Sequence, residues 1–190
     1  MTYKTNTTYT NQKAHGGYRN LKSYQTTTLI YDLSVEFVRL YIDRFSRTKD
    51  QMIQAARSGR QNIAEGSQAS ATSKKTEIKL VGVARASLEE LLIDYEDYLR
   101  QHGLSLWDKD SLEAKEIRAL SYQTDKTYET YRTYLKSAEA GANTILCLIH
   151  QANYLLDHQL QALEKAFISE GGFTENLFKR RLAEKRRSDL

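Results

Sequence analysis

Proline is absent from this chain of 190 residues, and cysteine occurs once. Proline and Asn-Gly pairs supply much of the turn chemistry of β-sheet proteins, and the chain has neither, which argues against a β fold. The single cysteine, Cys147, lies inside an apolar run. One cysteine excludes an internal disulfide framework and a cysteine-based metal site, and it favours a reducing, cytoplasmic setting.

Long apolar runs are also missing. No stretch approaches the roughly 20 apolar residues that span a bilayer. The first six residues lack the apolar centre of a signal peptide. We therefore expect a protein that neither enters a membrane nor leaves by the usual secretory route, and we place it in the cytoplasm.

Helix-forming residues dominate the composition, and apolar residues recur at steps of three and four. This pattern predicts an all-α protein. The hydrophobic content of 40% suits one compact domain with tails. We divide the chain into a flexible polar tail over 1–20, a helical-bundle domain over 21–170 and a basic suffix over 171–190.

Four long amphipathic stretches are predicted to be helices, at about 21–45, 48–66, 74–102 and 142–168. Thr48 followed by Gln51 indicates a capping box at the start of the second helix, and Ser73 is the expected cap of the third. Residues 104–140 form a long insertion with short helical pieces around 112–120 and 128–135. Together these elements predict an up-down four-helix bundle with a partly helical insertion before the last helix.

The first predicted helix is apolar on two sides. One seam runs from Leu21 to Phe45, and on nearly the opposite side lies a second stripe made of Ile30, Leu33, Phe37 and Leu40. A bundle core needs a single apolar face, so the other face must be buried elsewhere. We assign the second stripe to an interface between subunits. The alternative is that the insertion over 104–140 folds back and covers that face within one chain.

A cluster of tyrosines marks the insertion, and three of them, Tyr128, Tyr131 and Tyr134, recur at helical spacing. Such rings can stack on unpaired bases. In a helical cluster, however, packing is the commoner use of tyrosine. We therefore favour packing over base stacking for these three residues.

The net charge of +4 is unevenly distributed. Residues 1–47 hold seven basic and three acidic groups, and residues 171–190 hold six and three. Residues 104–170, in contrast, hold seven basic and ten acidic groups. A polyanion, if bound, should therefore contact the ends of the chain or a local basic patch.

Basic side chains that could contact phosphates occur on the second helix, around the start of the third helix and in the suffix. These candidates are Arg57, Arg60, Lys74, Lys75, Lys79, Arg85, Lys179, Arg180, Arg181, Lys185, Arg186 and Arg187. The alternative is that they are ordinary solvated charges, since short basic tails often serve only solubility. Lys74 and Lys75 lie at a helix start, where the helix dipole disfavours cations, and this placement slightly favours a function for them.

Motifs for several enzyme classes are missing. A carboxylate-bridged di-iron bundle needs a Glu three residues before a His, and none of the four histidines has one. The chain also lacks the Arg-to-His spacing of four to six residues used by some helical RNases, and it lacks a Gly-rich phosphate loop. We therefore expect no catalytic residue, no metal site and no cofactor, and we interpret the carboxylates of the third helix as a solvated face.

Four short segments read together as a signature: Leu21-Lys22-Ser23-Tyr24-Gln25, Ala55-Ala56-Arg57, Asn62-Ile63-Ala64-Glu65-Gly66 and Ala84-Arg85-Ala86-Ser87-Leu88-Glu89-Glu90-Leu91. Through them, residues 21–104 resemble a family of small bacterial four-helix-bundle proteins that includes the rRNA intervening-sequence proteins and the accessory proteins of diversity-generating retroelements. Two later segments, over 155–160 and 171–176, are similar to a subgroup that extends the bundle with a C-terminal suffix. The chain departs from the common members in its insertion over 104–140 and in Gly59, where a larger apolar residue is usual.

This resemblance implies a homo-oligomer, commonly a pentamer, with basic surfaces for RNA or DNA and, in the retroelement members, for a reverse-transcriptase partner. We therefore expect a non-enzymatic oligomeric helical-bundle protein that binds nucleic acid, a nucleic-acid enzyme such as a reverse transcriptase, or both. The alternative is a structural or protein-interaction module with no nucleic-acid ligand.

Overall fold

The structure, a computed structural model, describes residues 17–123 and 127–188, and every regular element in these two ranges is a helix. The elements are η1 (Tyr18–Asn20), α1 (Lys22–Tyr41), α2 (Arg47–Ala69), α3 (Lys74–Gln101), α4 (Leu112–Leu120), α5 (Tyr128–Arg132), η2 (Thr133–Lys136), α6 (Ala138–Glu170) and α7 (Phe173–Ser188), where η marks a 3₁₀ helix. The prediction of an all-α fold is confirmed for this part of the chain.

The polar tail expected over 1–20 lies mostly outside the described residues. Its last part is ordered, because Tyr18–Asn20 form a 3₁₀ helix and the Tyr18 ring packs edge-on against the Tyr24 ring with centroids 4.7 Å apart. Residues 18–20 therefore do not belong to a flexible tail.

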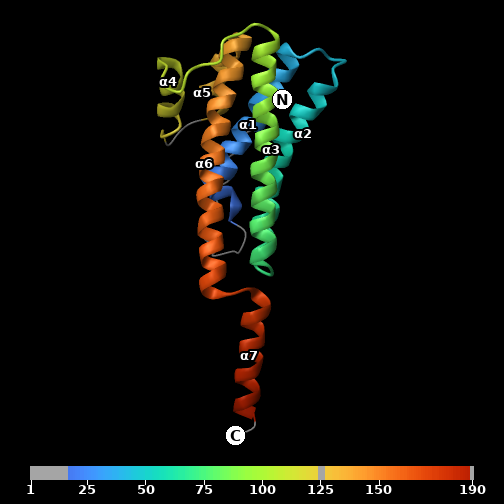
Figure 1. The fold of residues 1–190 in the computed structure, drawn as a ribbon, viewed down its shortest axis with the longest axis vertical. Coiled ribbons are helices and arrows are strands. Elements are labelled where there is room, and N and C mark those ends of the chain that lie inside the picture. The colour runs from blue at the N-terminus through green and yellow to red at the C-terminus, as the bar shows by residue number, and fades with distance from the viewer. Residues whose placement is uncertain (1–16, 124–126, 189–190) are drawn as a thin grey trace.

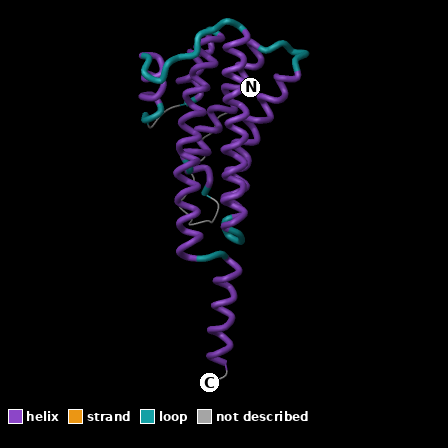
Figure 2. The backbone as a smooth tube through the Cα atoms, in the orientation of Figure 1, coloured by secondary structure: helices purple, strands orange, loops and turns teal. Residues whose placement is uncertain are grey.

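Four long helices, α1, α2, α3 and α6, lie side by side around one apolar core, and we call this group the helical bundle (Figure 1). Each of the four packs on two others, in the order α1, α2, α3, α6 and back to α1. The insertion between α3 and α6 holds α4, α5 and η2, near one end of the molecule. Helix α7 extends beyond the other end (Figures 1 and 2).

Four of the α-helices begin after a serine cap, and these serines are Ser46, Ser73, Ser111 and Ser137. Each serine hydroxyl accepts a hydrogen bond from a backbone N–H two or three residues later. The predicted cap at Ser73 is confirmed. The capping box predicted for Thr48 and Gln51 is wrong, because the backbone already becomes extended at Ile42 and Ser46 caps α2 first.

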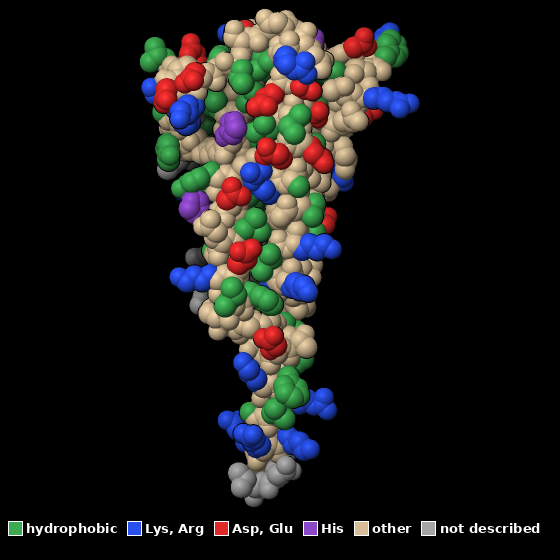
Figure 3. Space-filling view, viewed as in Figure 1, with side chains coloured by type: hydrophobic (Ala, Val, Ile, Leu, Met, Phe, Trp, Pro, Cys, Tyr) green, Lys and Arg blue, Asp and Glu red, His purple; other side chains and the backbone are tan. Residues whose placement is uncertain are grey.

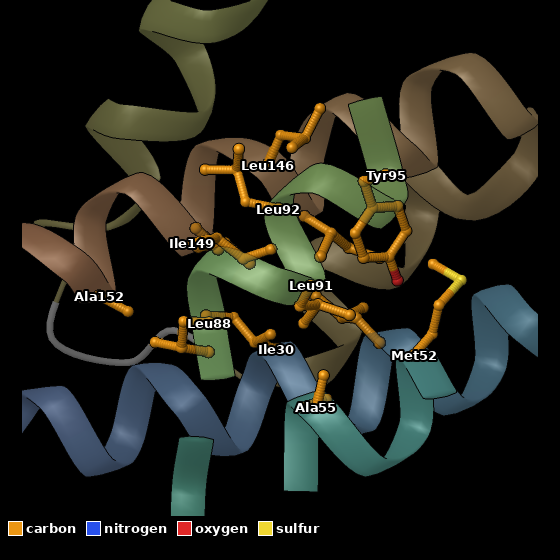
Figure 4. Close-up of a cluster of buried hydrophobic side chains, with 14 of the residues drawn as sticks. Ile30, Met52, Ala55, Leu88, Leu91, Leu92, Tyr95, Leu146, Ile149 and Ala152 are labelled. Atoms are coloured by element: carbon orange, nitrogen blue, oxygen red, sulfur yellow. The ribbon is translucent and has the colours of Figure 1, made fainter. Parts of the chain in front are cut away.

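The core takes apolar side chains from all four helices of the bundle. Figure 4 shows Ile30 of α1 and Met52 of α2 facing Leu88, Leu91 and Tyr95 of α3 and Ile149 of α6, and all six are fully buried. The Tyr95 hydroxyl donates a hydrogen bond to Ser34 Oγ at 3.0 Å. Its polar tip is therefore satisfied inside an apolar layer.

Helices α2 and α3 approach closely around Gly59. A Cβ atom at Gly59 would lie 2.8 Å from Cδ2 of the buried Leu88, so a larger residue would require the Leu88 side chain to shift within the core. On the same pair of helices, the Ser58 and Ser87 hydroxyls are 2.9 Å apart, and a Cβ at Gly66 would lie 3.4 Å from the Glu77 carbonyl oxygen. The glycine that departs from the family pattern thus has a packing role in this chain.

The two apolar sides of α1 are placed the other way round from our prediction. Ile30, Leu33 and Phe37 are 0% exposed inside the bundle, and only Leu40 of that stripe is exposed, at 44%. The assignment of Ile30, Leu33 and Phe37 to a subunit interface is therefore wrong. On the opposite seam, Thr28 and Tyr31 are half-buried and Val35 is 37% exposed.

The insertion covers part of α1. The Tyr41 hydroxyl of α1 donates to the Leu135 carbonyl at 2.6 Å, and Tyr131 and Leu135 are buried in the core cluster. Tyr128 and Tyr134 are half-buried against the same cluster. The insertion therefore folds back on α1, which was the alternative to a subunit interface, and the three tyrosines pack as predicted.

Phe37 joins these parts of the core, because its ring lies 5.1 Å from the rings of Tyr41, Tyr95 and Tyr98. Replacing Phe37 by Ala should lower the free energy of unfolding by about 3–5 kcal/mol, since a buried ring is lost and a cavity remains. Leu40→Ala, at a half-exposed site, should lower it by less than about 1 kcal/mol. Urea unfolding followed by circular dichroism measures both. A Phe37 variant that unfolds like the unaltered chain but has a smaller assembled mass would contradict this placement.

Candidate nucleic-acid interface

The basic suffix folds as α7, a helix of 16 residues that stands clear of the bundle (Figure 1). It holds six basic and two acidic groups, a surplus of four positive charges. All six basic side chains that we predicted as phosphate contacts on this helix are exposed, and Figure 3 shows Lys and Arg gathered around this narrow end. Arg187 lies 3.9 Å from Glu184, an exposed pair of the kind that contributes little.

The turn between α6 and α7 is defined by local hydrogen bonds. Gly171, with φ of +75°, ends α6 in a conformation that favours glycine. The Gly172 N–H then donates to Glu175 Oε2 at 3.2 Å, and Asn176 Nδ2 donates to the Glu170 carbonyl at 3.1 Å. These bonds set the direction in which α7 leaves the bundle.

The start of α3 lies beside this turn. Lys74 forms an ion pair with Glu170 at the end of α6, and Lys74 and Arg180 line the same hollow of about 170 Å³. Lys75 and Lys79 are exposed on the first two turns of α3. The structure therefore brings two groups of predicted residues, the α3 start and α7, to one end of the molecule.

Arg57 and Arg60 do not join this group. They lie in the middle of α2, roughly 15 Å along the helix from its end at Ala69. Arg57 is exposed, whereas Arg60 is half-buried with its guanidinium carbon 4.3 Å from the centroid of the Tyr31 ring of α1. This geometry is a cation–π contact, so Arg60 has a packing role between α1 and α2.

Arg85 lies on the seam between α3 and α6. Its Nη1 donates to Glu89 Oε2 at 2.6 Å, and its Nε donates to Asp157 Oδ1 at 3.2 Å. Burial lowers the pKa of Arg85, but the contacts with these two carboxylates outweigh burial and leave the pKa raised. Arg85 thus links α3 and α6, and its charge is already compensated within the chain.

Apolar side chains on α7 are a feature that the sequence analysis missed. Phe173, Leu177, Phe178 and Leu182 are 47%, 53%, 61% and 42% exposed. Ile168 near the end of α6 is 83% exposed. The signal in the sequence was four large apolar residues at steps of four, one and four, inside a segment that otherwise looks like a solvated basic tail.

Comparison of the chain with protein-family models, with curated proteins and with solved structures finds no match. Among the described residues, no helix combines the length and the apolar character that crossing a bilayer requires. Within the same ranges, His, Cys, Asp and Glu side chains form no group of three or more that could hold a metal ion.

Replacing Arg85 by Ala should leave binding to RNA and DNA unchanged, because its guanidinium already pairs with Glu89 and Asp157. The free energy of unfolding should fall by about 0.2–1 kcal/mol, the usual range for partly exposed ion pairs. Filter retention of labelled nucleic acid and urea unfolding measure the two effects. A clear loss of binding with unchanged stability would place Arg85 in the interface after all.

Proposed function

We propose that this chain is a non-enzymatic helical-bundle protein that acts as an oligomer and binds nucleic acid through α7 and the start of α3. The observation that carries the proposal is the exposed position of α7, with its surplus of four positive charges beyond the end of the bundle. Lysine and arginine on such a surface pair with phosphates and release counterions, which gives affinity without sequence preference. Lys75 and Lys79 extend the basic surface onto the bundle.

The proposed architecture of the core is an up-down four-helix bundle. The packing order α1, α2, α3, α6 and back to α1 supports it, as does the alternating course of these helices in Figure 1. In this arrangement α3 begins and α6 ends at the same end of the bundle. That is why the α3 lysines come close to the basic helix α7.

The exposed apolar side chains of α7 support an oligomer. A helix of 16 residues without tertiary packing is marginal in water, and Leu177 and Phe178 are more than half exposed. A second copy packed on this side would bury them. Five subunits and a reverse-transcriptase partner are proposed from the family resemblance alone.

The second candidate function is a structural or protein-interaction module with no nucleic-acid ligand. The same exposed residues favour it, because apolar side chains contribute little to contacts with a phosphate backbone. In this case α7 would bind protein through its apolar side chains, and its charges would serve solubility. The two functions differ in whether the positive charges of α7 are needed.

The triple variant Arg180→Ala, Arg181→Ala and Arg186→Ala tests the nucleic-acid function. Binding to single-stranded RNA or DNA at low salt should weaken, and the slope of log affinity against log salt should become shallower by about 2–3, since each lost phosphate contact removes about 0.7–0.9. Fluorescence anisotropy of labelled oligonucleotides over a salt series gives both quantities.

The matched control removes the same charge elsewhere. Arg39, Arg100 and Arg132 are 66%, 69% and 55% exposed and lie outside α7, so their triple replacement by Ala should preserve most of the affinity. Equal losses in the two triple variants would mean that net charge alone drives binding. If the unaltered protein binds neither RNA nor DNA at low salt, the interaction module is the better description.

Light scattering should give a mass that is a multiple of the 21.9 kDa of one chain. Leu177→Asp combined with Phe178→Asp should reduce this mass, because charged side chains cannot be buried at a subunit contact without a partner. Leu112→Asp, at an 82% exposed site on α4, is the control and should leave the mass unchanged. A single-chain mass at every concentration would refute the oligomer.

A further inference from the structure

A cavity of about 530 Å³ lies between α4 and α6. Figure 1 shows α4 near the end of the molecule opposite α7. Its lining comes from the loop before α4, from α4 itself and the turn after it, and from the middle of α6. This volume is in the range of small-molecule sites, about 300–1,000 Å³. The cavity involves none of the basic residues considered so far.

The walls of the cavity are held in place by the α6 side chains Asn143 and Glu139. Asn143 Oδ1 accepts a hydrogen bond from the Trp107 backbone N–H at 2.8 Å, and Asn143 Nδ2 donates to the Ser105 carbonyl at 2.8 Å. Glu139 Oε2 accepts the Ser105 N–H at 2.9 Å. Opposite this loop, Ala114 of α4 is buried where α4 packs on α6. A ligand would therefore meet a preformed site and lose little freedom in ordering it.

Aromatic rings and cations share the lining. The rings belong to Trp107, Tyr122 and Tyr154, and the cationic side chains are Lys109 and Arg118. No carboxylate is found among the described residues that line the cavity. Tyr122 and Tyr154 are 86% and 63% exposed, so most of their ring surface is available for stacking.

Polar atoms inside the cavity add to this pattern. Gln151 lines it and has a buried oxygen, Oε1, with no hydrogen-bond partner among the described residues. Burial raises the pKa of the Cys147 thiol, and the charge of Arg118, which lines the same cavity, opposes this rise. Among the described residues, the Arg118 guanidinium donates a hydrogen bond to the Lys109 carbonyl through Nη2, and a guanidinium has five N–H groups.

We infer that this cavity binds a nucleotide unit, an aromatic base joined to a sugar phosphate, with the base among Trp107, Tyr122 and Tyr154 and the phosphate at Arg118 and Lys109. An uncharged apolar ligand would leave the two cations unused, and a bare anion would leave the rings unused. The unit can come from a free mononucleotide or from an unpaired position in a single strand. The inference goes beyond the proposed function, because α7 would bind a phosphate backbone at the other end of the molecule.

The chain has its own reporters for the test. Trp107 is the only tryptophan and Cys147 the only cysteine, and both line this cavity in the full chain. Adenosine, guanosine, cytidine and uridine monophosphates should quench the Trp107 fluorescence in a saturable way and slow the reaction of Cys147 with a thiol reagent several-fold. If neither residue responds to these monophosphates at millimolar concentration or to short single-stranded oligonucleotides, the inference is overturned. Equal protection by inorganic phosphate alone would also overturn it.

Two variants distinguish contacts with the base from contacts with the phosphate. Arg118→Ala should weaken monophosphate binding about tenfold and leave binding of the phosphate-free nucleosides unchanged. Tyr154→Ala, at an exposed site, should weaken the binding of nucleotides and of nucleosides alike by about tenfold. Arg132→Ala, an exposed arginine of α5 outside the cavity, is the control and should change neither. Unchanged monophosphate affinity in both Arg118→Ala and Tyr154→Ala would overturn the inference.

Short homopolymeric oligonucleotides of RNA and DNA distinguish the two sources of the unit. Saturation by mononucleotides, with no gain from the oligonucleotides, identifies a free nucleotide, whereas a response to oligonucleotides alone identifies a strand. The α7 triple variant should keep the Trp107 response to mononucleotides. If the unaltered protein shows this response but does not retain RNA or DNA strands, the proposed function fails and the cavity inference stands; if it retains strands but shows no response, the cavity inference alone fails.

Discussion

The burial of one face of α1 is the constraint on which the rest of the structure depends. Ile30, Leu33 and Phe37 cannot remain in water, and the bundle closes over them with α2, α3 and α6. Phe37 also contacts three tyrosine rings, so it ties the end of α1 to α3. The insertion covers the flank of that face, where Leu135 lies beside Leu40 and its carbonyl accepts a hydrogen bond from the Tyr41 hydroxyl.

This arrangement places two kinds of surface at opposite ends of a long molecule. Beyond one end, α7 presents positive charge and apolar side chains with little support from the bundle. Near the other end, α4 and the loop before it are pinned to α6 and enclose a cavity lined by rings and cations. An exposed charged helix suits binding without sequence preference, whereas a preformed cavity suits recognition of a single chemical group.

Much of the helical pattern was predictable, because apolar periodicity and caps are local properties. The stretches containing α3 and α4 and the cap at Ser73 were found from spacing alone. The start of α2 was misplaced, because Ser46 and Thr48 are both acceptable caps and only the path of the chain after Ile42 selects Ser46. In the candidate site, the exposure of the α7 cations was predicted, but the compensation of Arg85 by Asp157 and the stacking of Arg60 on Tyr31 involve residues distant in the chain.

The amino-acid sequence by itself determined the all-helical class, the positions of the long helices and the basic character of the suffix, because each depends on residues within a few turns of one another. The tertiary structure decided which side of α1 faces inward, since both sides are apolar and only packing against the other helices distinguishes them. It also decided that the α3 lysines lie next to α7, and that Trp107 and Arg118 share a cavity with Cys147. Residues that are close in the structure in this way are tens of residues apart in the sequence. A local sequence pattern therefore does not predict that they come together.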